Sequence, residues 1–229
     1  MSRASMAAAA ARLPRSPIYG IGTYDVDGSR ADFEIGWDEL DRDTDWAHSV
    51  LVEAGVAKGD LVLFSTPNHE GPWTCPIVRS LRRIGAPYAT SETYGWDSRR
   101  FAMYLRRLPV KAIIGIGAET VRALSDSGEP VSSLLTEVDV VWARQDAVSL
   151  LRALQVEAAT YVPLGPALGL GLPGEHGARV NGDEWTVSDI GGRIHVSNQR
   201  PRATDFDSAD TGIYGEVETR GTDHLVVPR

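Results

Sequence analysis

The segment GVAKGDLVLF, residues 55–64, decides the fold because it joins the end of a helix to an apolar strand. Before it, apolar residues recur at steps of three and four from Trp37 onward, which predicts a helix that ends at Gly55. After the turn at residues 58–60, the run Leu61–Phe64 predicts a β-strand. A helix, a turn and an apolar strand in this order are typical of one unit of an α/β fold.

The alternation of helices and strands continues outward from this segment. Pro72 and Gly85 bound a second predicted helix, and Asp97 is the predicted N-cap of a third. Further strands are predicted at residues 86–89, 112–114 and 138–141, with helices at residues 119–125 and near 150–154. Strands that alternate with helices imply a parallel sheet covered by helices on both faces, so we expect an open, flavodoxin- or Rossmann-like α/β layer.

The composition of the sequence changes after about Val156, where the helical periodicity of apolar residues ends and Gly and Pro become frequent. The turn signals Asn181-Gly182 and Gly191-Gly192 separate short alternating runs, which is typical of β-hairpins. These runs are residues 184–188, 193–197 and 214–218. They predict a small antiparallel β unit of three to five strands that packs on the first half, since so few strands make a poor core alone.

We therefore divide the chain into three parts: an N-terminal lead-in at residues 1–35, an α/β domain at 36–157 and a β-rich subdomain at 158–229. The first eleven residues are less apolar than a secretory signal requires, and we expect a frayed segment there. No run of about 18 apolar residues occurs, so we expect no membrane span. The single cysteine, Cys75, allows no internal disulfide, which favours the cytoplasm.

The net charge of the chain limits the kinds of molecule that it is expected to bind. The 23 Lys and Arg residues against 31 Asp and Glu residues give a net charge of −8. This acidity argues against binding to nucleic acids or to anionic membranes. The five histidines do not show the spacing of metal ligands, so we expect no metal site. The loop Gly115-Ile116-Gly117 opens a predicted helix, but the pattern of a dinucleotide site is incomplete, which favours a plain tight turn.

The first half of the sequence contains six short segments whose order and spacing carry information: WDEL (37–40), AHSVL (47–51), GVAKGDLV (55–62), PN (67–68), RIGA (83–86) and VKAIIG (110–115). In that order and spacing they resemble the beginning of the acyl-adenylate-forming ligases, which include the acyl-CoA synthetases. The last third is similar to a later piece of phenylacetate-CoA ligase-like members, through Gly165–Leu168, His176, Glu184-Trp185 and Gly192–Val196.

The sequence departs from this family where ATP would bind. Family members carry a Ser/Thr/Gly-rich loop that ends in Pro-Lys and wraps the phosphates, and the sequence contains no such loop. We place the gap near residues 156–163. The family's ribose-binding Asp has no clear counterpart in residues 205–215, and Lys58 and Lys111 are the two lysines of the sequence. The resemblance thus implies a shortened relative, a pseudoenzyme without ATP or another cofactor.

The loops that follow two predicted strands carry the candidate site. Residues 66–70 and 91–97 should emerge at the same carboxyl edge of the sheet, where open α/β sheets place ligands. These loops and the helix after them supply the ligand-binding candidates Asn68, His69, Glu92, Tyr94, Trp96, Asp97 and Arg100. Aromatic and charged side chains together suit a small ligand, and we assign no catalytic residue.

We therefore expect an ATP-independent protein that binds a small acyl or aromatic ligand, or a partner ligase, and do not expect self-sufficient ligase activity. Two alternatives stay open at this point. One is an enzyme with ATP-free chemistry, such as acyl transfer or a lyase step, using His69 or Asp97. The other is an interaction protein whose apolar surface is covered in a homodimer.

Overall fold

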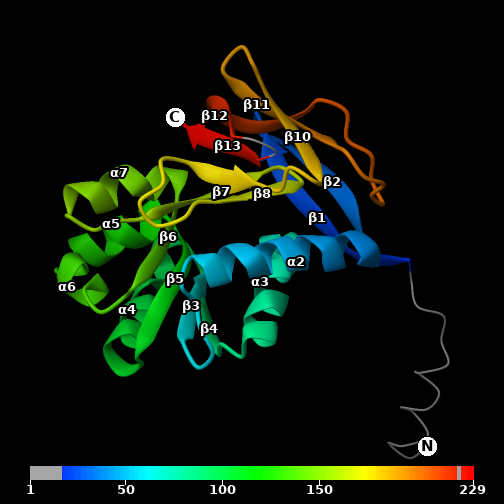
Figure 1. Ribbon diagram of the computed structural model, residues 1–229. Helices are drawn as coiled ribbons and strands as arrows, with labels where there is room; N and C mark the ends of the chain where they lie inside the picture. The colour runs from blue at the N-terminus through cyan, green and yellow to red at the C-terminus, as the bar shows by residue number, and fades with distance from the viewer. Residues whose placement is uncertain (1–16, 221–222) are drawn as a thin grey trace, which may run out of the picture.

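A computed structural model describes residues 17–220 and 223–229 (Figure 1). Most strands of this part join one sheet in the order β10-β11-β12-β13-β9-β8-β7-β6-β5-β3-β4, while β1 and β2 form a separate pair. The predicted α/β class is confirmed, since the large sheet contains parallel strands flanked by helices. The sheet continues across residue 158 without a break, and the predicted domain boundary there stays a prediction.

The α/β layer contains five parallel strands: β3 (Leu61–Ser65), β4 (Tyr88–Ser91), β5 (Val110–Ile116), β6 (Val140–Arg144) and β7 (Ala159–Leu164). Strand β3, the first of the five along the chain, lies between β4 and β5 in the sheet. This is the flavodoxin-like strand order, and it places the topological switch point between β3 and β5. Their side chains, such as Val62 and Leu63, are fully buried because helices cover both faces.

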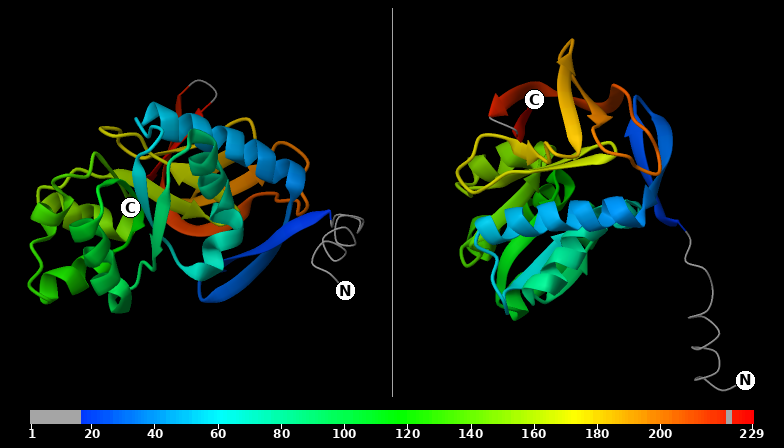
Figure 2. Two further views of the ribbon diagram at one scale, coloured as in Figure 1. Left: turned by 90° about the horizontal axis from the view of Figure 1, so that it is seen from below. Right: turned by 45° about the vertical axis from the view of Figure 1, so that its right-hand side comes forward.

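Helices α2 (Trp37–Glu53) and α3 (Gly71–Ile84) cover one face of these strands. The other face is covered by α4 (Ser98–Arg107), α5 (Ala118–Asp126), α6 (Val131–Leu135) and α7 (Gln145–Ala153), as Figures 1 and 2 show. Gly85 ends α3 in the left-handed conformation, as a C-terminal glycine does. Two short 3₁₀ turns, η1 (Asn68–Glu70) and η2 (Gly95–Asp97), precede α3 and α4.

The β-rich part extends the same sheet with antiparallel strands: β8 (Ala167–Leu170), β9 (Ala178–Val180), β10 (Trp185–Ile190), β11 (Arg193–Asn198), β12 (Ala209–Arg220) and β13 (Asp223–Pro228). Gly191 and Gly192 both have positive φ, 65° and 84°, and form the predicted hairpin turn between β10 and β11. The prediction of a hairpin at Asn181-Gly182 is wrong. That turn joins β9 to β10, which are not neighbours in the sheet.

The second half of the predicted lead-in at residues 1–35 contains two strands that the sequence did not predict. Strands β1 (Ile18–Val26) and β2 (Ser29–Gly36) form an antiparallel hairpin around Asp27-Gly28, whose φ angles are 51° and 79°. The hairpin packs on the β-rich part, where the rings of Phe33 and Phe206 lie 5.8 Å apart. Residues 1–11, where we expect a frayed segment, lie outside the described residues.

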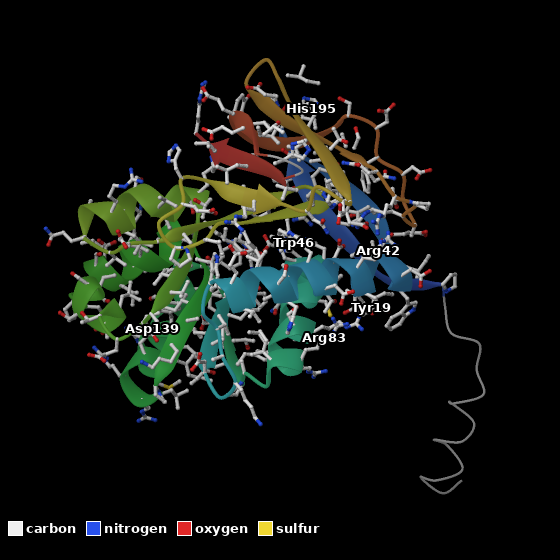
Figure 3. The ribbon with its side chains drawn as sticks, viewed as in Figure 1. Tyr19, Arg42, Trp46, Arg83, Asp139 and His195 are labelled. Atoms are coloured by element: carbon white, nitrogen blue, oxygen red, sulfur yellow. The ribbon has the colours of Figure 1, made fainter. Side chains whose placement is uncertain are left out.

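A buried ionic network ties α2 to the β-rich part. Arg42 of α2 is labelled in Figure 3 and donates a hydrogen bond at 2.6 Å to Glu184, the residue before β10. Glu184 also accepts a hydrogen bond from Arg202 at 3.0 Å. Arg202 also pairs with Asp43 of α2, and its guanidinium lies 4.2 Å from the ring centroid of Trp185. Arg202 and Glu184 side chains are 5% and 1% exposed. Removing one member would therefore strand an opposite charge away from water.

We predict that Arg202→Ala lowers the free energy of unfolding by about 3 kcal/mol or more, because Asp43 and Glu184 would lose their shared buried cation. Urea unfolding followed by tryptophan fluorescence measures this loss. Arg200→Ala is the matched control: Arg200 lies 3.6 Å from the same carboxylate, but its side chain is 52% exposed. The control should change stability by less than about 0.5 kcal/mol. Equal losses in both variants would contradict this account.

Candidate functional site

The loops after β3 and β4 meet at the carboxyl edge of the sheet, as expected for neighbouring parallel strands. The backbone N–H of Thr66 donates to the carbonyl of Ser91 at 3.2 Å. The hydroxyl of Ser65 donates to the carbonyl of Glu92 at 3.4 Å. These bonds hold the start of one candidate loop against the start of the other, so side chains from both can face one ligand.

A hollow of about 300 Å³ opens between these loops, α3 and the start of α4. Its walls combine two aromatic rings with short polar side chains. The lining residues are Phe64, Thr66, Pro67, Asn68, Gly71, Thr74, Val78, Tyr88, Thr90, Ser91, Glu92 and Arg100. The volume lies at the lower end of the range of small-molecule sites, roughly 300–1,000 Å³. Among the candidates from the sequence, Asn68, Glu92 and Arg100 line this hollow.

Asp97 does not line the hollow, and its carboxylate instead holds the loop after β4 in place. Its Oδ2 accepts hydrogen bonds from the backbone N–H of Glu92 at 2.8 Å and from Nε of Arg100 at 3.0 Å. Hydrogen bonding by Asp97 raises the pKa of Arg100 above its ordinary value. Asp97 precedes α4 but makes no side-chain cap, because its carboxylate is engaged in these bonds.

The other three candidates do not line the hollow. Tyr94 stacks on Trp96 with ring centroids 6.3 Å apart, and Trp96 is 71% exposed. Burial raises the pKa of Tyr94, and the nearby carboxylates of Glu70 and Glu92 raise it further. His69 is exposed on the short turn η1. Tyr94 and Trp96 thus form an aromatic rim on the neighbouring part of the same edge.

Sequence reasoning missed an ion pair close to this edge. Arg144, the last residue of β6, donates to Glu70 of η1, and both side chains are largely buried. The Arg144 guanidinium lies 5.3 Å from the ring centroid of Tyr161 on β7. Burial raises the pKa of Tyr161 well above its ordinary value, and its hydroxyl has no partner among the described residues. A charged residue at the carboxyl end of a buried strand was the signal available in the sequence.

The turn at Gly115–Gly117 is closed by the chain itself. The Thr93 hydroxyl donates to the carbonyl of Gly115 at 3.1 Å, and the Thr120 hydroxyl donates to the carbonyl of Thr93 at 2.7 Å. A Cβ atom at Gly117 would lie 2.4 Å from Oγ1 of Thr93. The space where a pyrophosphate would meet the start of α5 is therefore filled, which favours the tight turn over a dinucleotide site.

Residues 17–220 and 223–229 contain no group of three or more His, Cys, Asp or Glu side chains placed to hold a metal ion. Within the same part of the chain, no helix is long and apolar enough to span a membrane.

No family model matches the chain, and no curated protein sequence matches it. Solved structures do. A 2-hydroxyisobutyryl-CoA ligase complex with 2-HIB-AMP and CoA superposes with a TM-score of 0.69 at 11% identity, over 94% of this chain and 52% of the ligase. Mycobacterium smegmatis MbtA gives 0.64 at 12% identity, over 95% and 47% of the two chains. E. coli MenE with a bound OSB-AMS analogue gives 0.55 at 13% identity, over 90% and 47%.

These likenesses confirm the fold expected from the sequence, that of the acyl- and aryl-adenylate-forming ligases. The chain spans about half the length of the ligases it matches. Identities of 10–13% establish the fold alone.

We predict that Tyr161→Phe leaves the free energy of unfolding unchanged or raises it by about 1 kcal/mol, because the buried hydroxyl lacks a partner in the described part of the chain. Urea unfolding at neutral pH measures the difference. Tyr214→Phe, at a ring that is 53% exposed, is the control and should change stability by less than about 0.5 kcal/mol. A loss above about 1 kcal/mol in Tyr161→Phe would show that the hydroxyl is hydrogen-bonded in solution.

Proposed function

We propose that this protein binds a small acyl or aromatic ligand in the hollow between β3, β4 and α3, and that it does so without ATP. The observation that carries the proposal is the convergence of two strand-end loops on one concave surface with aromatic walls and polar groups. Ligand sites are typically concave and mostly apolar, with a few polar groups that fix orientation.

The aromatic walls support an acyl or aromatic ligand. Phe64 on β3 and Tyr88 on β4 line the hollow from neighbouring strands, and Val78 of α3 adds an aliphatic surface. Phe64 is 5% exposed, so its ring is held by the core and does not have to be ordered when a ligand binds. A preformed wall of this kind reduces the entropy lost on binding.

Independence from ATP is supported by what occupies the candidate nucleotide positions. The start of α5 is filled by Thr93, and the backbone N–H of Ala118 already donates to Asp146 at 3.3 Å. Lys58 precedes β3 and Lys111 is the second residue of β5, so both lysines lie at the amino edge, opposite the hollow. A phosphate held at the carboxyl edge would have neither ammonium group near it.

We therefore propose a shortened pseudoenzyme that works in the cytoplasm and uses the ligase fold for binding. The alternative of ATP-free catalysis with His69 or Asp97 has less support, because neither residue lines the hollow. The alternatives of a homodimer and of a partner ligase would place a protein surface over the aromatic rim of Tyr94 and Trp96.

We predict that filling the hollow abolishes binding. The probes are phenylacetate, 2-phenylethanol and 2-phenylethylamine, tested by saturation-transfer NMR and isothermal titration; at least one should bind with millimolar affinity or better. Thr90→Trp adds a large side chain at an exposed position that lines the hollow, and should weaken that binding about tenfold or more.

Thr186→Trp, at an exposed threonine of β10 outside the hollow, is the matched control and should bind like the wild type. Failure of all three probes to bind, or equal binding by Thr90→Trp and the control, would overturn the proposed function.

A further inference from the structure

The charges around the hollow do not cancel. Asp97 is paired with Arg100, and Glu70 is paired with Arg144. Glu92 lines the same hollow, yet its carboxylate has no hydrogen bond or ion pair within the described part of the chain. After these pairings, one negative charge is left over at the wall of the hollow.

The position of this carboxylate makes it available to a ligand. Glu92 is 7% exposed, and its carboxylate oxygens are not among the fully buried atoms that lack a partner, so the exposed part of the residue includes the carboxylate. A cationic ligand in the hollow therefore meets a carboxylate that no arginine of the hollow pairs with. The two hydrogen bonds that involve Glu92 use its backbone N–H and carbonyl, which fixes the residue while leaving the side chain for another partner.

The carboxylate shares the hollow with the aromatic side chains. Glu92 lines it together with Phe64 and Tyr88. An ionised carboxylate accepts hydrogen bonds only, through two oxygens, so it suits a group with several N–H donors.

The aromatic walls suit the same group. A cation near the face of an aromatic ring is attracted to it, and Phe64 and Tyr88 line the hollow that Glu92 borders. The one guanidinium on the lining, that of Arg100, already donates to Asp97 through two nitrogens. The net charge of the chain, −8, favours the approach of a cation over that of an anion.

We infer that the ligand of this hollow is an aromatic molecule that carries an ammonium group. The ammonium donates to the carboxylate of Glu92, while the ring lies against Phe64 and Tyr88. This inference rests on the proposed function, because it specifies the chemistry of the ligand in the same hollow.

Three isosteric probes test the inference on the wild-type protein: 2-phenylethylamine, neutral 2-phenylethanol and anionic phenylacetate. They share the ring and differ in the charge at the end of the chain. At pH 7 the amine should bind at least about tenfold more tightly than the alcohol, and the acid should bind most weakly. Equal affinities, or tighter binding of phenylacetate, would overturn the inference and leave the proposed function standing. Absence of binding by all three would overturn both.

A charge variant then assigns the effect to Glu92. Glu92→Gln should weaken binding of 2-phenylethylamine about tenfold and leave that of 2-phenylethanol unchanged. Glu137→Gln removes the same charge at an exposed position outside the hollow and should bind all three probes like the wild type. Unchanged amine binding in Glu92→Gln would overturn the inference. Thermal unfolding shows whether the variant is folded, and the wild-type ranking decides the matter where it is not.

Discussion

The parallel pairing of β3 with both β4 and β5 is the constraint on which the rest of this structure depends. It requires β3 to be buried on both faces, and Val62 and Leu63 meet that requirement with no exposed surface. It also sends the chain first to one side of β3 and then to the other, through α3 and α4. The loops after β3 and β4 therefore emerge side by side. The candidate side chains of the site lie on these two loops and at the start of α4, so the strand pairing sets where they are.

The same pairing explains why the hollow lies beside the switch point rather than in it. Between β3 and β5 the carboxyl edge is the usual ligand position of an open α/β sheet. In this chain Thr93 crosses to that position and binds the carbonyl of Gly115. The crossing draws the loop after β4 toward α5, and the hollow opens on the side of β4 and α3. Thr93 thereby fills the space at the start of α5 where the phosphates of a dinucleotide would lie in an open α/β sheet.

Local patterns in the sequence were sufficient where a structural feature is set by neighbouring residues. The periodic residues after Trp37 and the apolar run Leu61–Phe64 predicted α2 and β3, and strand-end logic placed Asn68 and Glu92 at one hollow. Features that join distant segments were not predictable in this way. The partners Glu70 and Arg144 are 74 residues apart, and nothing local marks them as a pair. The hairpin of β1 and β2 had a local signal at Asp27-Gly28, which the low apolar content of its strands obscured.

We propose that the protein binds its ligand in this hollow and not at the start of α5. Backbone ¹⁵N–¹H chemical-shift mapping distinguishes the two positions, in parallel titrations with 2-phenylethylamine and with magnesium-ATP. We expect the amine to shift the amides of Thr66, Asn68 and Glu92 in a saturable manner, and magnesium-ATP to leave the amides of Gly117 and Ala118 unshifted. Saturable shifts at Gly117 and Ala118 with magnesium-ATP, together with none around the hollow with the amine, would contradict it.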